Sequence, residues 1–350
     1  MLQGGGAMNV EEHVPKISIV LPTFNRARFI PQAIASITQQ TFRDWELIVV
    51  DDGSTDGSEE IIARFSRDVP NPIRYLKQEN QGPAAARNLG IRNARGEYIA
   101  FFDSVDTWEA EHLEVCVREL DANADVDWVY SSFRRVRIES GEVIDADAFF
   151  ETGSRAEFLS LKTSVRGDLH VIDDADALMC SIKSGLCVGL RTSVVRRKVF
   201  QKVEFPPFRV GEDQVLYPRA LANGVKFGYV LPVQATAYVH DGNISEVAGV
   251  LSTDKYVETL SELIRAFESI CDLPLARRER QALEHRIANE SFWNLGYACL
   301  SAGRNEDALE YLQKGLRLWP QNLMFWKTYV VAVLRVAVRN VRLRVSRLGH

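Results

Sequence analysis

Clustered carboxylates follow two apolar segments of this 350-residue chain. The apolar run 98–102 is followed by Asp103 and Asp106, and the run 45–50 is followed by the pair Asp51–Asp52. Parallel strands carry the groups that follow them to the carboxyl edge of a sheet, where open α/β sheets bind their ligands. Carboxylate oxygens are also the ligands that Mg²⁺ and Mn²⁺ prefer. The pattern therefore indicates a crevice for a nucleotide and a divalent cation.

The elements that must position these groups follow from hydrophobic periodicity. Runs rich in β-branched residues predict strands at 16–21, 46–50, 73–76 and 97–102, with helices at 28–39, up to 65, and at 81–94. Later segments predict strands at 126–133, 142–150, 188–191 and 227–230, a helix at 214–223, and only helices from 252 onward. Strands that alternate with short helices are typical of an α/β, Rossmann-like, mostly parallel sheet flanked by helices. The remainder predicts an all-helical C-terminal appendage.

Composition sets limits on the class of protein. The chain is 46% hydrophobic and 25% charged, which is ordinary for a globular protein, and its net charge of -5 argues against nucleic-acid binding. Its five cysteines show no CxxC spacing, which favours reduced thiols and a cytoplasmic location. The chain contains no stretch of about 18 uncharged apolar residues, so the sequence predicts no transmembrane helix. The segment 1–14 lacks the features of a signal peptide and predicts a flexible leader.

Five short segments occur in a fixed order along the chain. They read PTFNR (22–26), VVDDGSTDGS (49–58), NQGPAAARNLGI (80–91), GEYIAFFDSVDTW (96–108) and GED (211–213). In this order and spacing, the chain resembles the family 2 inverting glycosyltransferases of the GT-A fold over about residues 15–245. The resemblance implies transfer of a sugar from a nucleotide diphosphate-sugar to a glycan or lipid-linked acceptor, in surface polysaccharide or glycoconjugate synthesis. It favours a UDP-sugar as the donor.

The resemblance places the donor site at the ends of the first strands. Asp52 is similar to the family aspartate that accepts a hydrogen bond from the uracil ring, and Arg87 to the arginine that faces the nucleotide phosphates. The other residues expected to bind the nucleotide-sugar are Pro22, Thr23, Asn25, Arg26, Asp51, Gly82, Asn88, Asp103, Ser104 and Trp108. The residues alone leave three alternatives, namely loop capping by Asp51–Asp52, an exposed helical arginine at 87, and core packing of Trp108.

Asp103 to Asp106 occupies the family's DxD position. That motif holds a divalent cation, Mn²⁺ or Mg²⁺, which bridges the donor phosphates and neutralises charge on the leaving nucleoside diphosphate. In this chain Val105 stands where the second acid of the motif is expected. Asp106 can take its place, Asp103 can hold the cation together with His240, or metal binding and activity are impaired. The last case gives the alternative function of a catalytically impaired sugar-nucleotide binding or scaffold protein.

Glu212 and Asp213 resemble the family's ED motif. Inversion by direct displacement requires a carboxylate that takes the proton of the attacking acceptor hydroxyl. We expect Asp213 to be this base, with Glu212 as its neighbour or substitute; the alternative is that both acids only stabilise a helix N-terminus. A nucleotidyltransferase is disfavoured because no glycine-rich, lysine-containing phosphate loop follows the first strand.

The sequence predicts four parts, namely the leader 1–14, a catalytic domain at 15–248, a helical region at 249–320 and a basic amphipathic helix at 321–350. The spacing in 291–320 matches one tetratricopeptide repeat, although an ordinary helical hairpin matches almost as well. Residues 311–350 contain eight Lys or Arg and no acid, so the rest of the chain carries -13 once those eight charges are removed from -5. Apolar and aromatic residues with purely positive charge favour peripheral contact with an anionic membrane surface, on its cytoplasmic face. The alternative is a core-packed helix with a basic tail.

Overall fold

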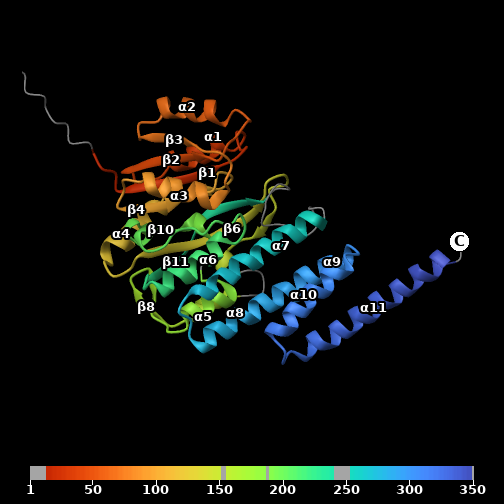
Figure 1. Ribbon diagram of the computed structural model, residues 1–350. Helices are drawn as coiled ribbons and strands as arrows, with labels where there is room; N and C mark the ends of the chain where they lie inside the picture. The colour runs from red at the N-terminus through yellow and green to blue at the C-terminus, as the bar shows by residue number, and fades with distance from the viewer. Residues whose placement is uncertain (1–12, 151–154, 187–188, 240–252, 349–350) are drawn as a thin grey trace, which may run out of the picture.

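The computed structural model describes residues 13–150, 155–186, 189–239 and 253–348. One mixed sheet organises the first two-thirds of the chain, with the strand order β3-β2-β1-β4-β10-β6-β11-β9-β8 (Figure 1). The strands of its first half are β1 (Ile17–Thr23), β2 (Trp45–Asp51), β3 (Ile73–Lys77) and β4 (Tyr98–Phe101). These four strands pair in parallel, so their carboxyl ends meet at one edge of the sheet.

The second half of the sheet is mostly antiparallel. Its strands are β6 (Trp128–Arg137), β8 (Thr163–Arg166), β9 (Leu169–Ile172), β10 (Val194–Arg196) and β11 (Phe227–Val239), with the short strands β5 (Thr107–Trp108) and β7 (Val143–Asp145) beside β11 and β6. β10 lies antiparallel between β4 and β6, and β11 returns parallel to β6. This connection brings the end of β11 back to the turn that follows β4.

Helices cover both faces of the sheet. One face carries α1 (Ile30–Thr38), α2 (Ser58–Asp68) and α4 (His112–Ala122), and the other carries α3 (Pro83–Asn93), α5 (Ala177–Ser184) and α6 (Glu212–Ala222). Side chains alternate along β1, so Ile19 packs with Ile34 of α1 while Val20 packs with Ala86 of α3. A Cβ at Gly90 of α3 would lie 2.5 Å from Val20, so glycine is required for this close approach.

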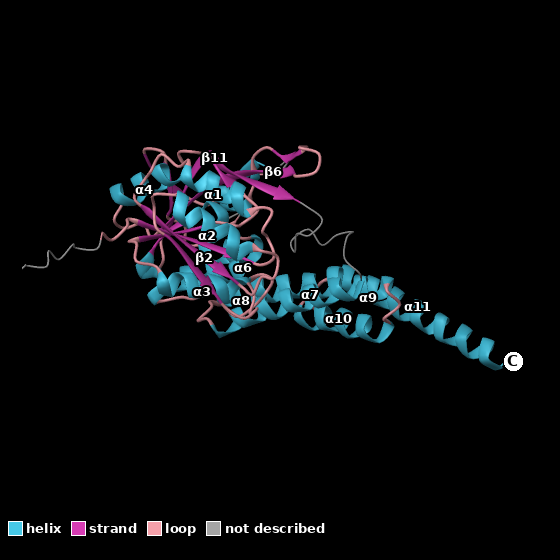
Figure 2. Ribbon diagram, turned by 90° about the horizontal axis from the view of Figure 1, so that it is seen from above, coloured by secondary structure: helices cyan, strands magenta, loops and turns pink. Residues whose placement is uncertain are grey.

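The C-terminal third is helical, as the sequence predicts. It comprises α7 (Thr253–Glu268), α8 (Arg277–Asn289), a π-helical turn (Glu290–Gly296), α9 (Tyr297–Ser301), α10 (Asn305–Leu318) and α11 (Leu323–Leu348). Phe267 of α7 and Leu283 of α8 share a core with Ile182 of α5 and Val215 of α6. The bundle therefore packs on the α5–α6 side of the sheet, and α11 extends from it away from the sheet (Figures 1 and 2).

Two predicted strands differ from the structure. The segment 142–150 forms a strand only at Val143–Asp145, because the Asp147 carboxylate then accepts the amide N–H of Phe149 and begins a 3₁₀ turn. The strand predicted at 188–191 is wrong, since Leu190–Thr192 is also a 3₁₀ turn. The 3₁₀ turns of the described chain lie at Ala148–Phe150, Glu157–Ser160, Leu190–Thr192, Arg197–Gln201 and Ser269–Asp272. The sequence interpretation also missed α4, α5 and the β8–β9 hairpin.

Candidate active site

The loops that follow β1 and β2 are joined by hydrogen bonds. The amide N–H of Asn25 donates to Ser54 Oγ at 2.9 Å, and the Thr55 N–H donates to Asn25 Oδ1 at 2.9 Å. The Ala27 N–H donates to a carboxylate oxygen of Asp56 at 2.8 Å. Asn25 has a φ of 51°, a left-handed conformation that asparagine tolerates better than most residues. The segments 22–27 and 51–56 therefore form one ordered rim at the sheet edge.

Asp51, the first acid of the segment VVDDGSTDGS, is held inside this rim by hydrogen bonds. Asp51 is fully buried, and its two oxygens accept the Ser54 N–H at 2.7 Å and the Tyr75 hydroxyl at 2.6 Å. Arg26 is half-buried, and burial lowers the pKa of its guanidinium. The Thr23 hydroxyl at the end of β1 is buried and has no hydrogen-bond partner among the described residues. It is thus a polar group at the sheet edge that a bound ligand could satisfy, next to the half-buried Pro22.

Asp52 holds the turn that leads into α3. One carboxylate oxygen accepts the Gln81 N–H at 2.9 Å and the Gln78 side-chain amide at 2.7 Å, and the other accepts the Gly82 N–H at 2.8 Å. Gly82 has a φ of 91°, in the region that favours glycine, and it is buried. These contacts support the loop-capping alternative for Asp52. Its contact with a nucleotide base stays a prediction.

Arg87 connects two motifs that lie far apart in the sequence. Its guanidinium donates to Glu212 Oε1 at 2.6 Å and to Asp103 Oδ1 at 3.1 Å. The side chains of Arg87 and Glu212 are each only 9% exposed, and that of Asp103 is 29% exposed. The alternative of an exposed helical arginine is therefore wrong. A buried guanidinium requires such carboxylate partners, because desolvation of an unpaired charge is costly.

The acids around Arg87 titrate unusually. Burial raises the pKa of Glu212 to about 7, Asp213 adds to the rise, and Arg87 opposes it. Burial also raises the pKa of Asp213, again against Arg87. Burial acts in the same direction on Asp103, but Arg87 and Arg191 outweigh it and lower the pKa of that carboxyl. The pKa of Asp103 therefore lies below its ordinary value, whereas the pKa values of Glu212 and Asp213 lie above theirs.

Arg191 is a site residue that the sequence analysis did not identify. Its guanidinium donates to Asp106 Oδ2 at 2.5 Å, and the Tyr238 N–H donates to Asp106 Oδ1 at 3.2 Å. Asp106 is 1% exposed, and burial raises its pKa to about 7. Arg191 lies in the 3₁₀ turn Leu190–Thr192, outside every recognised motif, so no spacing signal pointed to it.

These contacts bear on the predicted cation site. Both oxygens of Asp106 are engaged, which argues against Asp106 as a metal ligand, and the Val105 side chain offers no donor atom. Asp103 has one oxygen bonded to Arg87 and is partly exposed. One carboxylate combined with substrate phosphates is a common Mg²⁺ arrangement, so Asp103 fits as a ligand. His240 lies outside the described residues, and within those residues no group of three or more His, Cys, Asp or Glu could hold a metal ion.

The predicted base lies at the start of α6. Asp213 is half-buried in the first turn, two residues after Gly211, which has a φ of 78°. A Cβ at Gly211 would lie 2.6 Å from Leu263 of α7. The Arg209 N–H donates to Glu262 of the same helix at 2.7 Å. The helical appendage thus contacts and supports the loop that presents the Glu212–Asp213 pair.

Three further predicted residues mainly contact other parts of the protein. The Asn88 side chain donates to the Phe205 carbonyl at 2.8 Å and accepts the Phe205 N–H at 3.0 Å. Trp108 is 6% exposed, and its indole N–H donates to the Arg191 carbonyl at 2.5 Å. Ser104 is buried in the turn after β4. This geometry favours packing and positioning for Asn88 and Trp108, and their contact with a donor stays a prediction.

Comparison with known proteins places the chain in context. Residues 18–179 match the model of glycosyl transferase family 2. The chain is 37% identical over 134 residues to an uncharacterized glycosyltransferase of Rickettsia felis, covering 38% of this chain and 22% of that protein. It is 27% identical over 279 residues to the glycosyltransferase GlyA of Streptococcus pneumoniae, covering 78% of this chain and 38% of that protein. The chain therefore spans well under half the length of these relatives.

Solved structures share the fold. Staphylococcus aureus TarS 1–349, in complex with UDP-GlcNAc, matches with a TM-score of 0.59 and 18% identity over 87% of this chain and 81% of that chain. The mannosyltransferase PcManGT of Pyrobaculum calidifontis, in complex with GDP-Man and Mn²⁺, matches with a TM-score of 0.51 and 19% identity over 94% of this chain and 88% of that chain. The predicted GT-A fold, with a C-terminal helical region, is confirmed.

Proposed function

From the match of residues 18–179 to the model of glycosyl transferase family 2, we propose that the chain transfers a sugar with inversion from a nucleotide diphosphate-sugar to a glycan or lipid-linked acceptor. We propose a role in surface polysaccharide or glycoconjugate synthesis. The observation that supports transfer best is the Arg87 bridge, which joins the acid after β4 to the acid pair of α6. The buried Arg87 guanidinium thereby joins a candidate base region and a candidate donor site at the carboxyl edge of the sheet.

The proposed reaction is a single displacement. The acceptor hydroxyl attacks the anomeric carbon on the face opposite the nucleoside diphosphate. A new C–O bond forms as the bond to the phosphate oxygen breaks, and the electron pair of that bond leaves with the nucleoside diphosphate. The hydroxyl proton passes to the carboxylate of Asp213, whose raised pKa makes it a stronger base than an exposed aspartate. Glu212 is bonded to Arg87, so we assign it to positioning that arginine.

The donor side of the site contains the Asp103 carboxylate and two guanidinium groups, those of Arg87 and Arg191. We propose that the guanidinium groups of Arg87 and Arg191 face the diphosphate and stabilise the charge that develops on it, because both lie beside the turn after β4. Asp103 would hold a divalent cation, which would supply positive charge to neutralise the leaving nucleoside diphosphate. We assign the Thr23 hydroxyl, which is buried without a hydrogen-bond partner among the described residues, to a hydrogen bond with the donor. A UDP-sugar is our first candidate, since TarS was solved with UDP-GlcNAc.

A second candidate function is sugar-nucleotide binding without turnover. It is favoured by Val105 in the cation motif and by Asp106, whose oxygens are held by Arg191 and by the backbone of Tyr238. The two functions share donor binding and differ in product formation. A binding measurement alone therefore does not distinguish them.

The test combines titration calorimetry with release of nucleoside diphosphate from a panel of UDP- and GDP-sugars, with and without Mn²⁺. We expect Asp213→Asn to lower turnover by about 10² or more and to leave donor affinity within about twofold, because only the proton acceptor is lost. Asp68→Asn, at an exposed position of α2, is the matched control and should keep full turnover. Full activity of Asp213→Asn would remove Asp213 from the mechanism. Donor binding by the unaltered protein without any product would support the second candidate.

A further inference from the structure

The last helix, α11, has an apolar surface that the rest of the described chain does not cover. Phe325 and Ala332 are buried, and Phe325 stacks on Phe292 of the π-helical turn with ring centroids 4.1 Å apart. This side attaches α11 to the bundle. Within Leu323–Val338, the exposed large apolar side chains are Leu323, Met324, Trp326, Val330, Val331, Leu334 and Val338, with exposed fractions between 43% and 81%.

The spacing of these residues makes the exposed surface continuous. Trp326, Val330 and Leu334 follow one another at four-residue intervals, so their side chains form one row along the helix. A helix that is apolar on its exposed side as well as its packed side lacks the polar face of an ordinary surface helix. Contiguous apolar surface of this kind marks an interaction site.

Charge identifies the partner. Within Leu323–Val338 the charged residues are Lys327 and Arg335, both exposed and both cationic. The whole segment 311–350 contains eight basic residues and no acidic residue, whereas the net charge of the chain is -5. Apolar side chains, an interfacial tryptophan and exclusively positive charge match the chemistry of an anionic bilayer surface, with its acyl boundary and its phosphate headgroups. A neutral protein surface would give no reason for the one-sided charge.

The position of α11 is suited to such contact. The helix leads away from the sheet and past α10, so its far end lies at the periphery of the molecule (Figures 1 and 2). No helix among the described residues has the length and apolarity needed to cross a membrane. We propose that α11 docks the protein on an anionic bilayer surface, with the 326–330–334 row in the headgroup region and Lys327 and Arg335 at lipid phosphates. The cytoplasmic leaflet, with its anionic lipids, is the surface we assign.

The test is cosedimentation of the full chain with vesicles of phosphatidylcholine alone or mixed with phosphatidylglycerol. We expect binding to the anionic vesicles that weakens as salt rises. The variant Val330→Gln/Leu334→Gln should bind at least about tenfold more weakly, because it removes apolar area without changing charge. Lys327→Gln/Arg335→Gln should lose about fivefold per charge on anionic vesicles and little on neutral ones.

Matched controls use equally exposed positions elsewhere. Val14→Gln/Leu231→Gln removes exposed apolar side chains, and Arg67→Gln/Arg92→Gln removes exposed charges, and both should bind like the unaltered protein. Melting curves check that each variant is folded, and the charge variant alone suffices if the apolar variant is not. Equal binding of neutral and anionic vesicles by every protein would overturn the proposal. So would light scattering that shows a dimer, lost in Val330→Gln/Leu334→Gln, with vesicle binding unchanged, because the row would then join two copies of the chain.

Discussion

Two networks of acidic and basic side chains in this molecule have similar hydrogen-bond lengths but differ in burial. In the candidate site, Arg87 donates to Glu212 at 2.6 Å, and both side chains are 9% exposed. In the outer network, Arg166 donates to Asp125 at 2.7 Å, but these side chains are 36% and 50% exposed. Distance alone therefore does not separate a structural surface pair from a group that can perform chemistry. Burial does, because it removes the solvent that screens charge and raises the pKa of a carboxyl group toward neutrality.

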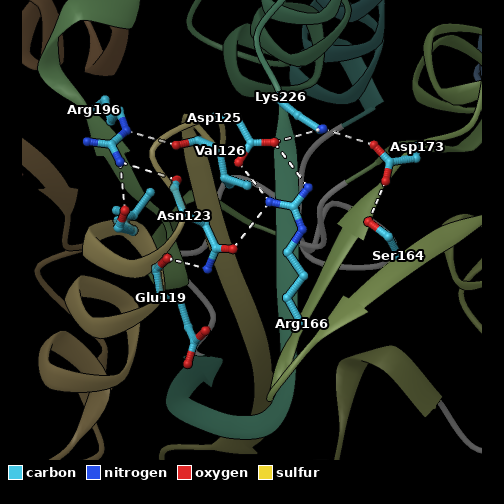
Figure 3. Close-up of polar contacts among 10 residues, drawn as sticks. Glu119, Asn123, Asp125, Val126, Ser164, Arg166, Asp173, Arg196 and Lys226 are labelled. Carbon is cyan, nitrogen blue, oxygen red and sulfur yellow. Dashed lines mark hydrogen bonds and ion pairs between the residues drawn. The ribbon is translucent and has the colours of Figure 1, made fainter.

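The outer network ties the β8–β9 hairpin to the rest of the sheet (Figure 3). Arg166 of β8 contacts both oxygens of Asp125, at 2.7 and 3.1 Å, and the side-chain oxygen of Asn123 at 3.2 Å. Lys226 lies between Asp125 and Asp173, at 3.0 and 3.1 Å. Hydrogen bonds from Arg166 and Lys226 lower the pKa of Asp125. Such exposed pairs contribute little to stability, because water already solvates both charges.

The first way to test this contrast is to remove the buried guanidinium of Arg87. Arg87→Met leaves Glu212 and Asp103 buried without their counter-charge, so we expect the free energy of unfolding to fall by about 3–5 kcal/mol at pH 8. Urea denaturation measures the change. Arg166→Met is the matched control in the outer network and should unfold at nearly the same urea concentration as the unaltered protein. Equal losses in the two variants would show that burial does not set the difference.

The pH dependence of the same variant sharpens this test. Burial already raises the folded-state pKa of Glu212 to about 7, and loss of Arg87 raises it further. A glutamate in the unfolded chain has a pKa of about 4.3, so the folded state takes up the proton at a higher pH than the unfolded state does. Proton uptake by the folded state stabilises it, and the deficit of Arg87→Met should therefore shrink between pH 8 and pH 6. A deficit that stays constant over this range would contradict the assignment of Glu212 as the affected partner.

Asp52 gives an intermediate case, because it is buried but bonded to backbone amides. Asp52→Ala leaves the N–H groups of Gln81 and Gly82 without their acceptor, so we expect a loss of about 1–3 kcal/mol in stability. Donor affinity should fall by a similar amount, because the turn into α3 precedes Arg87. Denaturation and calorimetry on the same variant measure the two losses. Loss of affinity with unchanged stability would instead indicate direct contact of Asp52 with the nucleotide base.

The sequence predicts the parallel half of the sheet well, and the reason is physical. β1, β2 and β4 are buried on both faces, so they read as largely apolar runs whose limits lie within two residues of the prediction. The acids that follow them must then share one edge. The antiparallel half is less legible, because β8 and β10 are three or four residues long and their residues carry no clear alternation. Whether these short segments form strands depends on how they pair with segments that are distant in the sequence.

The candidate site shows the same limit. Arg87, Asp103 and Glu212 stand in ordered motifs, and the structure brings them into contact. Arg191 could not be predicted, because its neighbour Asp106 lies 85 residues away and their contact depends on how β10 inserts between β4 and β6. Membership of a motif also did not reveal which acids have an oxygen free to bind a ligand or to accept a proton. That property depends on hydrogen-bond partners, which only the folded chain defines.

The smallest expected effect concerns the outer network itself. Asp125→Asn removes the charge that Arg166 and Lys226 share, yet keeps an oxygen that can accept a hydrogen bond. Because the side chain is half exposed, we expect the melting temperature to change by less than about 2 °C in 0.1 M salt and turnover to stay unchanged. At 1 M salt the Debye length is only about 3 Å, so even this small difference should disappear. A melting temperature lowered by more than about 5 °C would show that the hairpin depends on this pair. A loss of turnover in the same variant would go further, because it would link the outer network to the site and remove the contrast between them.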